Sequence, residues 1–448
     1  MHTPRIAHAE IPQRIRDEPC MLVQRAIPDV YVLWHPCCAH GQTLASRLYA
    51  WLRPGNGFGP DVFYRSVPAP DAPPGGLPLA LPGESRFDQP MAGSSGTSLK
   101  QANMQVVILL IDENMIADPV WRYWLALLAR VPNAPVRRVF LPVALDSTAF
   151  NVPSPVSEVN FLRPNGLPLC DKKDPAYAPG LEIVVRSLLK QLTEALCRLL
   201  LMPNDITHSN KTHLGVPQGS QAKISLFLSH AKIDGGLPAR RLRDYIYSQT
   251  QLAAFYDEND IPFGSAFAKV LQSSVQASQT AAMIAVKSAQ YASRPWCRRE
   301  IALFRKPVPE DGHPGNAERW RLNPLVVVNA LEPGAQTSGI PEIGNATHFG
   351  WSSERSDQEE QIVTLVLRDV LLAAFHSALG SSIDGNPNQI IINWLPDPTT
   401  LLQIPRVREF QSPVQILYPG RGLSGLELDN LDELFPHVSF LSFDRATS

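Results

Sequence analysis

Short apolar segments alternate with amphipathic segments along this chain, and that alternation limits the folds open to it. Residues 105–111 (QVVILLI) form an unbroken apolar run, which is typical of a strand buried on both faces. The amphipathic stretch 119–130 follows with a proline in its first turn, and another apolar run covers 138–145. Strands that are separated by helices predict parallel sheets covered on both sides, so we expect an α/β protein.

The same succession of elements occurs twice. In both copies an apolar strand is followed by a polar turn, a proline, a tryptophan and an apolar helix. We interpret this as an internal repeat; the alternative is a chance agreement between two unrelated parallel-sheet units. The aligned segments are Val106–Trp121 with Ala281–Trp296, 62–65 with 254–257, 33–35 with 228–230, and 140–143 with 323–326.

Domain boundaries follow from this repeat and from a polar, turn-rich stretch at 203–221 that is typical of a linker. The expected segments are a leader at 1–27, a first unit at 28–163, a helix and linker at 164–221, a second unit at 222–350, and a helix with a small α/β appendage at 351–448.

Composition and charge exclude several classes of protein. The net charge of −2 argues against a strongly basic nucleic-acid-binding protein. The six cysteines form no CxxC pair, and no histidine cluster has metal-ligand spacing, so we expect reduced thiols and no metal. The N-terminus has no apolar signal core, and no uncharged apolar run reaches the roughly 18 residues that span a bilayer. We therefore expect a cytoplasmic protein without membrane contact.

Three motifs in the second unit carry a family resemblance. An apolar strand ends at 227–230 (FLSH), and a helix carries 296–300 (WCRRE). Between them, 254–264 (AFYDENDIPFG) contains a strand and a glycine-bearing loop. In this order and at this spacing, the motifs resemble those of bacterial TIR (Toll/interleukin-1 receptor) domains, and the resemblance covers residues 222–350.

The resemblance implies a flavodoxin-like fold with a five-stranded parallel sheet. It also implies an NAD⁺ glycohydrolase or cyclase, an activity common in bacterial TIR proteins that act in defence against phage. NAD⁺ would be the substrate, and no cofactor would be required. Such domains complete their pocket by homo-oligomeric stacking through the loop that corresponds to Asn259–Phe267, and an unknown partner can activate them. The expected assembly residues are Asn259, Asp260, Ile261, Pro262, Phe263 and Gly264.

Glu300 is the candidate catalytic residue. Cleavage of the bond between ribose and nicotinamide passes through an oxocarbenium-like state, and a nearby carboxylate can stabilise its positive charge without a metal. Trp296 lies four residues earlier on the same helical face, so we expect it to wall the nicotinamide or ribose side. Ser229 and His230 end the first strand, where doubly wound sheets bind ligands, and are candidates for contacting ribose or phosphate.

The expected substrate-binding set also includes Phe227 and Asp257, and most members have a purely structural alternative. Glu300 could be a surface carboxylate paired with an arginine. Trp296 could fill the core, and His230 could be a structural histidine. Asp257 could serve only to shape the loop that contains it.

The first unit lacks this chemistry at the aligned positions. The alignment places Leu125 at the carboxylate position, Trp34 at that of Ser229 and Arg65 at that of Asp257. Leucine cannot stabilise a cation, so we expect a degenerate TIR-like domain that scaffolds or senses. The contrast favours an enzyme over two alternatives. One is a TIR adaptor that signals through TIR–TIR contacts without turnover, and the other is a nucleoside ribosyltransferase of similar architecture.

The C-terminal segment contains a second nucleotide-binding pattern that we discount. After the strand at 414–419, Gly420–Gly425 has GxGxxG spacing, and Asp444 follows at about the distance of the usual acidic residue. We expect no separate sheet to complete such a fold, and Asp429, Asp432 and Glu433 place negative charge on the helix that follows. The function of this segment cannot be assigned from the sequence.

Overall fold

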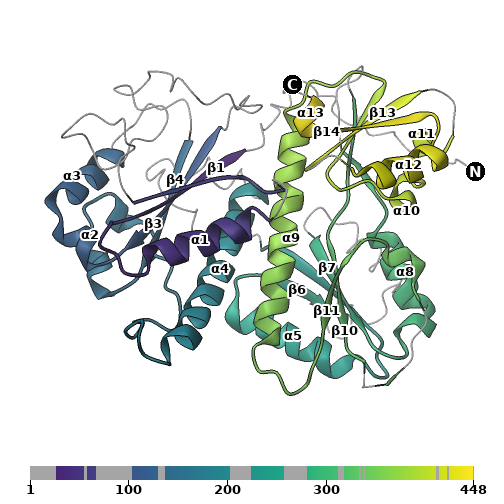
Figure 1. Cartoon of the computed structure of the whole chain (residues 1–448). Helices are drawn as coiled ribbons and strands as arrows, with labels where there is room; N and C mark the ends of the chain where they lie inside the picture. Colours follow the sequence, from purple (N-terminus) through teal and green to yellow (C-terminus); the bar gives the residue numbers. More distant parts are fainter. Residues whose placement is uncertain are drawn as a thin grey trace, which may run out of the picture.

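Three β-sheets with their flanking helices make up the described part of the chain (Figure 1). The structure is a computed structural model. It describes residues 27–54, 58–66, 103–129, 137–201, 223–256, 280–310, 317–331, 334–335, 339–409, 413–420 and 423–446. The predicted α/β class is confirmed, because the first and second sheets are parallel throughout.

The first sheet has the strand order β2-β1-β3-β4. Its apolar strands form where the sequence predicts them, and β3 is buried along its whole length. A parallel bridge between Val143 and Leu162 continues the sheet beyond β4. The strands are β1 (Pro28–Trp34), β2 (Asp61–Arg65), β3 (Met104–Ile111) and β4 (Arg137–Ala144). The helices are α1 (Gly41–Leu52), α2 (Glu113–Ala117), α3 (Pro119–Leu128) and α4 (Tyr177–Leu201).

The second sheet repeats this order with one more strand, as β6-β5-β7-β10-β11. Numbered along its own unit, the order is 2-1-3-4-5, and the order in the first sheet is 2-1-3-4. The strands are β5 (Ser225–His230), β6 (Ala253–Tyr256), β7 (Thr280–Lys287), β10 (Leu325–Asn329) and β11 (Thr347–Gly350). The helices are α5 (Gly236–Gln249), α8 (Pro295–Phe304) and α9 (Gln358–Ser381).

The third sheet corrects our expectation that the C-terminal segment lacks a sheet. Its order is β14-β13-β12-β9-β8, and all neighbouring strands are parallel except β8 and β9. Two of its strands come from inside the range 222–350, directly after α8. The strands are β8 (Val308–Glu310), β9 (Glu318–Arg321), β12 (Gln389–Ile392), β13 (Val414–Tyr418) and β14 (Val438–Ser442). The helices are α10 (Pro398–Leu401), α11 (Pro405–Arg408), α12 (Gly425–Leu434) and α13 (Phe443–Ala446).

Helix α9 runs through the centre of the molecule, with the first unit on one side and the other two sheets on the opposite side (Figure 1). It contacts α4, α5, β7, β10, β9 and β12. Among the described helices, α9 alone is long and apolar enough to cross a membrane, but 61% of its most apolar window is buried. Its apolar residues join the core between the first two sheets.

The last helices of the two repeats, α4 and α9, pack against each other and make matching contacts. Lys190 of α4 lies over the ring of Tyr245 in α5, 5.4 Å from its centroid. Arg368 of α9 lies over the ring of Trp51 in α1, 4.7 Å from its centroid. Lys190 also pairs with Glu360 of α9 at 3.6 Å. Each repeat therefore places a cation from its last helix on an aromatic ring in the first helix of the other repeat.

Burial corrects the alignment of the repeats by one residue in the strands. Val107 and Leu109 of β3 pack under α3, whereas Met283 and Ala285 of β7 pack under α8. Successive side chains of a strand point to opposite faces, so a one-residue slip would exchange the two faces. Val107 therefore corresponds to Met283, one position beyond the alignment made from sequence.

The helices show the same shift, which corrects the assignment of Leu125. Both α3 and α8 begin with proline and bury residues three, six, seven and ten places into the helix. The buried sets are Trp121, Trp124, Leu125 and Leu128 in α3, and Cys297, Glu300, Ile301 and Phe304 in α8. The residue that corresponds to Glu300 is thus Trp124, and Leu125 corresponds to Ile301.

Candidate active site

The candidate site lies where the strand order of the second sheet reverses. β5 is flanked by β6 and β7, and the chain crosses from one side of β5 to the other between them. In open α/β sheets, ligands bind outside the carboxyl ends of the strands at this point. Ser229 and His230 are the last two residues of β5. The structure therefore places them at the predicted edge.

Glu300 reaches this edge from α8. Its side chain belongs to the buried face of the helix and is 5% exposed. The hydroxyl of Ser229 donates a hydrogen bond to Oε2 of Glu300. The alternative of a surface carboxylate is therefore wrong. A buried carboxylate is costly unless hydrogen bonds compensate it, so this arrangement needs the polar contact that Ser229 supplies.

Tyr291 joins these two residues and was missed in the sequence. It belongs to a short 3₁₀ turn, η4 (Tyr291–Ser293), and it is fully buried. Its hydroxyl oxygen lies 2.6 Å from Oγ of Ser229. Burial first, and then the charge of Glu300, raises the pKa of Tyr291 well above its ordinary value. A comparison of the two repeats could have singled out Tyr291, because the first unit has an apolar residue at the corresponding position.

Asp234 fixes the turn that carries Tyr291. One carboxylate oxygen accepts from the hydroxyl of Ser288 at 2.6 Å, and the other accepts from the backbone N–H of Gln290 at 2.9 Å. Asp234 follows β5 and Ser288 follows β7, so the side chain ties together the loops after these two neighbouring strands. Sequence reasoning missed Asp234 because a lone aspartate in a turn has no distinctive spacing.

Phe227 and His230, the other two predicted residues of β5, point to opposite faces of the sheet. Phe227 is 1% exposed and packs in the core under α8. Because side chains alternate along a strand, His230 points to the other face of the sheet from Ser229. The carbonyl of His230 accepts a hydrogen bond from Sγ of Cys297 at 3.6 Å. Cys297 therefore ties α8 to β5 as a structural residue.

Trp296 lies one turn before Glu300 but faces solvent. It is 45% exposed, so the alternative of a core-filling tryptophan is wrong. The guanidinium of Arg299 lies 5.4 Å from the centroid of its ring. The large exposed indole at the start of α8 is thus available to contact a ligand at this edge of the sheet.

The remaining predicted site residues lie outside the described part of the chain. They are Asp257 and the assembly residues Asn259, Asp260, Ile261, Pro262, Phe263 and Gly264. The helix that we expect over 264–277 also lies there. The structure does not test these residues, and their roles stay predictions from the sequence.

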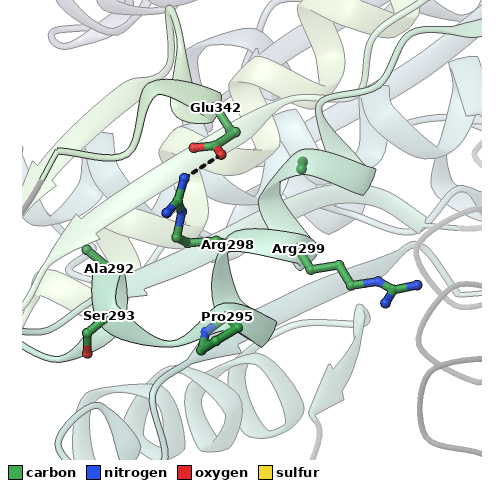
Figure 2. Close-up of a pocket in the computed structure, with 7 residues that line it drawn as sticks. Ala292, Ser293, Pro295, Arg298, Arg299 and Glu342 are labelled. Atoms are coloured by element: carbon green, nitrogen blue, oxygen red, sulfur yellow. Dashed lines mark hydrogen bonds and ion pairs between the residues drawn. The ribbon is translucent and has the colours of Figure 1, made fainter.

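A pocket of ≈ 440 Å³ lies on the other face of α8 (Figure 2). Arg298 points across it to Glu342, with Nη2 and Oε1 2.9 Å apart, and Arg299 points away from that pair. Residues 295, 298, 299 and 302 line the pocket at helical spacing and lie opposite the buried face that carries Glu300. This pocket is therefore separate from the candidate site.

Two described parts of the glycine-rich segment after β13 make contacts within the protein. A side chain at Gly420 would overlap the ring of Phe58, which packs directly on that glycine. Ser424 and Glu427 form a capping box at the start of α12, so the helix N-terminus is already satisfied by its own side chains. Phe58 therefore covers the first glycine of the pattern, and the N-terminus of α12 is capped by side chains of its own helix.

Comparison with known proteins adds no assignment to this geometry. In the described residues, no group of three or more His, Cys, Asp or Glu side chains could hold a metal ion. No protein-family model matches the chain, and no curated protein is significantly similar to it.

Proposed function

We propose that the second unit is a TIR-type NAD⁺ glycohydrolase, or cyclase, with Glu300 as the catalytic carboxylate. The observation that carries the proposal is the buried Glu300 carboxylate, which Ser229 holds at the carboxyl edge of the sheet where the strand order reverses. A single oriented carboxylate in a site shielded from water meets the need of a reaction that develops positive charge on ribose.

The topology supports the TIR-type assignment of this unit. A strand order of 2-1-3-4-5 in a parallel sheet is the order of flavodoxin-like folds. The motifs at 227–230 and 296–300 lie on β5 and α8, and the motif at 254–264 begins in β6. The first unit repeats the order without the carboxylate, which is the pattern expected of a degenerate copy.

Each residue has a defined part in the proposed reaction. Glu300 stabilises the cation that forms at the anomeric carbon as nicotinamide departs, and it holds the ribose hydroxyls. Ser229 orients the carboxylate through its hydrogen bond. Trp296 presents its indole to the nicotinamide or ribose side. Nicotinamide is a good leaving group in NAD⁺, so this scheme assigns no side chain as a general acid.

The first unit is proposed to scaffold the enzyme. It covers the α5 and α9 side of the second unit through the packing of α4 on α9. Arg186 of α4 forms an ion pair with Asp357 at the start of α9, and Lys190 pairs with Glu360. With that side occupied within the chain, homo-oligomeric stacking has to use other surfaces, among them the predicted loop Asn259–Phe267.

Assembly is proposed to switch the enzyme on, in a cytoplasmic role in bacterial defence against phage. An enzyme that completes its pocket between subunits has a specific activity that rises with protein concentration. A rate per molecule that stays constant from nanomolar to high micromolar protein would contradict assembly control but leave the chemistry in place.

The test is nicotinamide release from NAD⁺ by the purified full chain at high concentration, with and without a crowding agent. Glu300→Gln should abolish release, and Glu342→Gln, which changes a surface glutamate paired with Arg298, should not. Product chromatography separates linear from cyclic ADP-ribose. Release that Glu300→Gln leaves unchanged would refute the assignment, and no release under any condition would favour the TIR adaptor.

A further inference from the structure

Three buried polar side chains form a chain of hydrogen bonds, and the proposed reaction uses only two of them. Glu300 accepts from Ser229, and Ser229 lies 2.6 Å from the hydroxyl of Tyr291. The residue with no part so far is Tyr291, although its side chain is fully buried between the sheet and α8. A buried tyrosine hydroxyl needs a partner, and this one is aimed at the residue that holds the carboxylate.

The direction of these hydrogen bonds follows from counting donors. An ionised carboxylate only accepts, so Ser229 donates to Glu300. A serine hydroxyl has one hydrogen, which this bond uses. Tyr291 must therefore be the donor in the bond to Ser229. Because burial raises the pKa of Tyr291 well above its ordinary value, its hydroxyl is protonated at neutral pH.

We propose that Tyr291 is a positioning residue for the reaction, acting through Ser229 on Glu300. Its hydrogen bond fixes the serine hydroxyl in the rotamer that points at Oε2, and it polarises that hydroxyl so that it donates more strongly. The effect is to hold Glu300 ionised and in one orientation inside the protein. This inference rests on the proposed function for its catalytic meaning, but the coupling of the three residues stands on geometry alone.

The surroundings of Glu300 define what else can affect its ionisation. In the described residues, Ser229 faces it from β5, Tyr291 faces it from η4, and Cys297 neighbours it on α8. His230 lies on the opposite face of the sheet. Removing the hydroxyl of Tyr291 weakens the bond that favours the charged form of Glu300, so the pKa of Glu300 should rise.

The first experiment measures the pH dependence of kcat/KM for nicotinamide release by the full-length protein. Tyr291→Phe should shift the acidic limb upward by about one pH unit and lower kcat about tenfold, with KM little changed. Ser229→Ala, which removes the bond to Glu300 itself, should shift the limb at least as far, and the double variant should shift no further than Ser229→Ala because both changes break one chain. The matched control is Tyr245→Phe, a half-buried tyrosine of α5 whose hydroxyl accepts a hydrogen bond from Lys190.

If Tyr291→Phe lowers kcat/KM by the same factor at every pH and does not move the acidic limb, the inference is overturned. Tyr291 would then have only a packing role. Tyr291→Met introduces the side chain of Met115, the corresponding residue of the first unit, and keeps the test decisive if the phenylalanine variant folds poorly. If the pH shifts of Tyr291→Phe and Ser229→Ala add in the double variant, the two residues act independently, and the proposed chain of hydrogen bonds is contradicted.

A second measurement separates failure of this inference from failure of the proposed function. Melting temperatures of the wild type, Tyr291→Phe, Glu300→Gln and the double variant form a cycle that needs no turnover. Non-additive effects support the coupling even if no NAD⁺ is consumed. Additive effects show that Tyr291 does not act on Glu300, whatever the activity.

Discussion

The two repeats have the same layers of strands and helices, but they differ in the polarity of the side chains at one buried position. At the carboxyl end of the sheet, under the helix that follows the third strand, the first unit places the apolar side chains of Leu33, Met115 and Trp124, whereas the second unit has the hydrogen-bonded chain. The strand register and the burial of the helices set the correspondence. The corresponding pairs are Leu33 with Ser229, Met115 with Tyr291, and Trp124 with Glu300.

The difference separates what the fold needs from what the proposed function needs. In the first unit the ring of Trp124 is completely buried and packs edge-on against Trp121, which maximises apolar contact. In the second unit a carboxylate takes the same place and is a net cost to stability that hydrogen bonds offset only in part. The first unit shows that the fold can close this place with apolar residues, so the polar chain is not required for folding.

The largest expected effect comes from placing the carboxylate of one unit in the other. Trp124→Glu would bury a charge with Leu33 and Met115 as its neighbours instead of a serine and a tyrosine. We expect the free energy of unfolding to fall by more than about 4 kcal/mol, because both a cavity and an unpaired buried charge result. Chemical denaturation measures this change.

Trp124→Leu is the matched control for that substitution. It removes volume without adding charge and should cost less. If the two variants proved equally stable, the first unit would be able to accommodate a carboxylate, and the comparison between the units would lose its physical basis.

The reverse exchange in the second unit should separate activity from stability. Glu300→Leu removes the buried charge and leaves an apolar side chain, as in the first unit. Nicotinamide release should fall by about 10² to 10³-fold, the usual effect of losing one electrostatic contact to the transition state. The melting temperature should change little, because the loss of the buried charge offsets the loss of the hydrogen bond that Ser229 donates to it. A melting temperature that falls by several degrees would instead show that Glu300 is structural.

The described strands of both repeats and the helices that follow their third strands could be predicted from the sequence, whereas the correspondence between the repeats could not be fixed to one residue. The apolar runs and the proline-initiated helices determine where the strands and α8 begin, and the structure has them within a few residues of the expected bounds. To decide that Val106 corresponds to Ala282 and not to its neighbour, one must know which layer of helices each side chain packs against. In strands that are apolar on both faces, the sequence pattern does not record that face.

The candidate site was predictable only where a motif marked it. Glu300 and Ser229 belong to motifs, and the structure brings them together. Tyr291 and Asp234 act through a turn and through contacts between loops far apart in sequence, which no local spacing reveals. The third sheet was missed for the same reason, because β9 precedes β10 in the chain but pairs with β12 across α9.

A smaller effect should distinguish the units at the opposite edge of the sheets. Asp29 of β1 lies beside Asp61 of β2, and burial, with a further contribution from Asp61, raises the pKa of Asp29 to about 6. Its ionised form is disfavoured in the fold, so the wild type loses stability as the pH rises from about 4 to 6. Asp29→Asn should therefore raise the melting temperature at pH 7.5 and have little effect at pH 4.

The gain from Asp29→Asn at pH 7.5 should be about 1 to 2 kcal/mol, less than the full shift would give, because the carboxyl group is partly exposed. The corresponding strand of the second unit begins with Ser225, where Ser225→Ala provides a control without a titrating group. A gain from Asp29→Asn that does not depend on pH would show that the substitution acts through packing and not through ionisation.

The smallest expected effect concerns how α3 and α8 begin. Asp118 caps α3 by accepting from the backbone N–H groups of Val120 and Trp121, whereas Arg294 at the same place before α8 makes no capping bond with its side chain. Asp118→Ala should lower the free energy of unfolding by about 1 kcal/mol, and Arg294→Asp should raise it by about 0.5 to 1 kcal/mol. If α8 is left uncapped because a cation before Trp296 helps to bind the anionic NAD⁺, Arg294→Asp should also raise KM while the protein becomes more stable. A stabilised variant with unchanged KM would show instead that the missing cap is a neutral difference between the repeats, with no part in substrate binding.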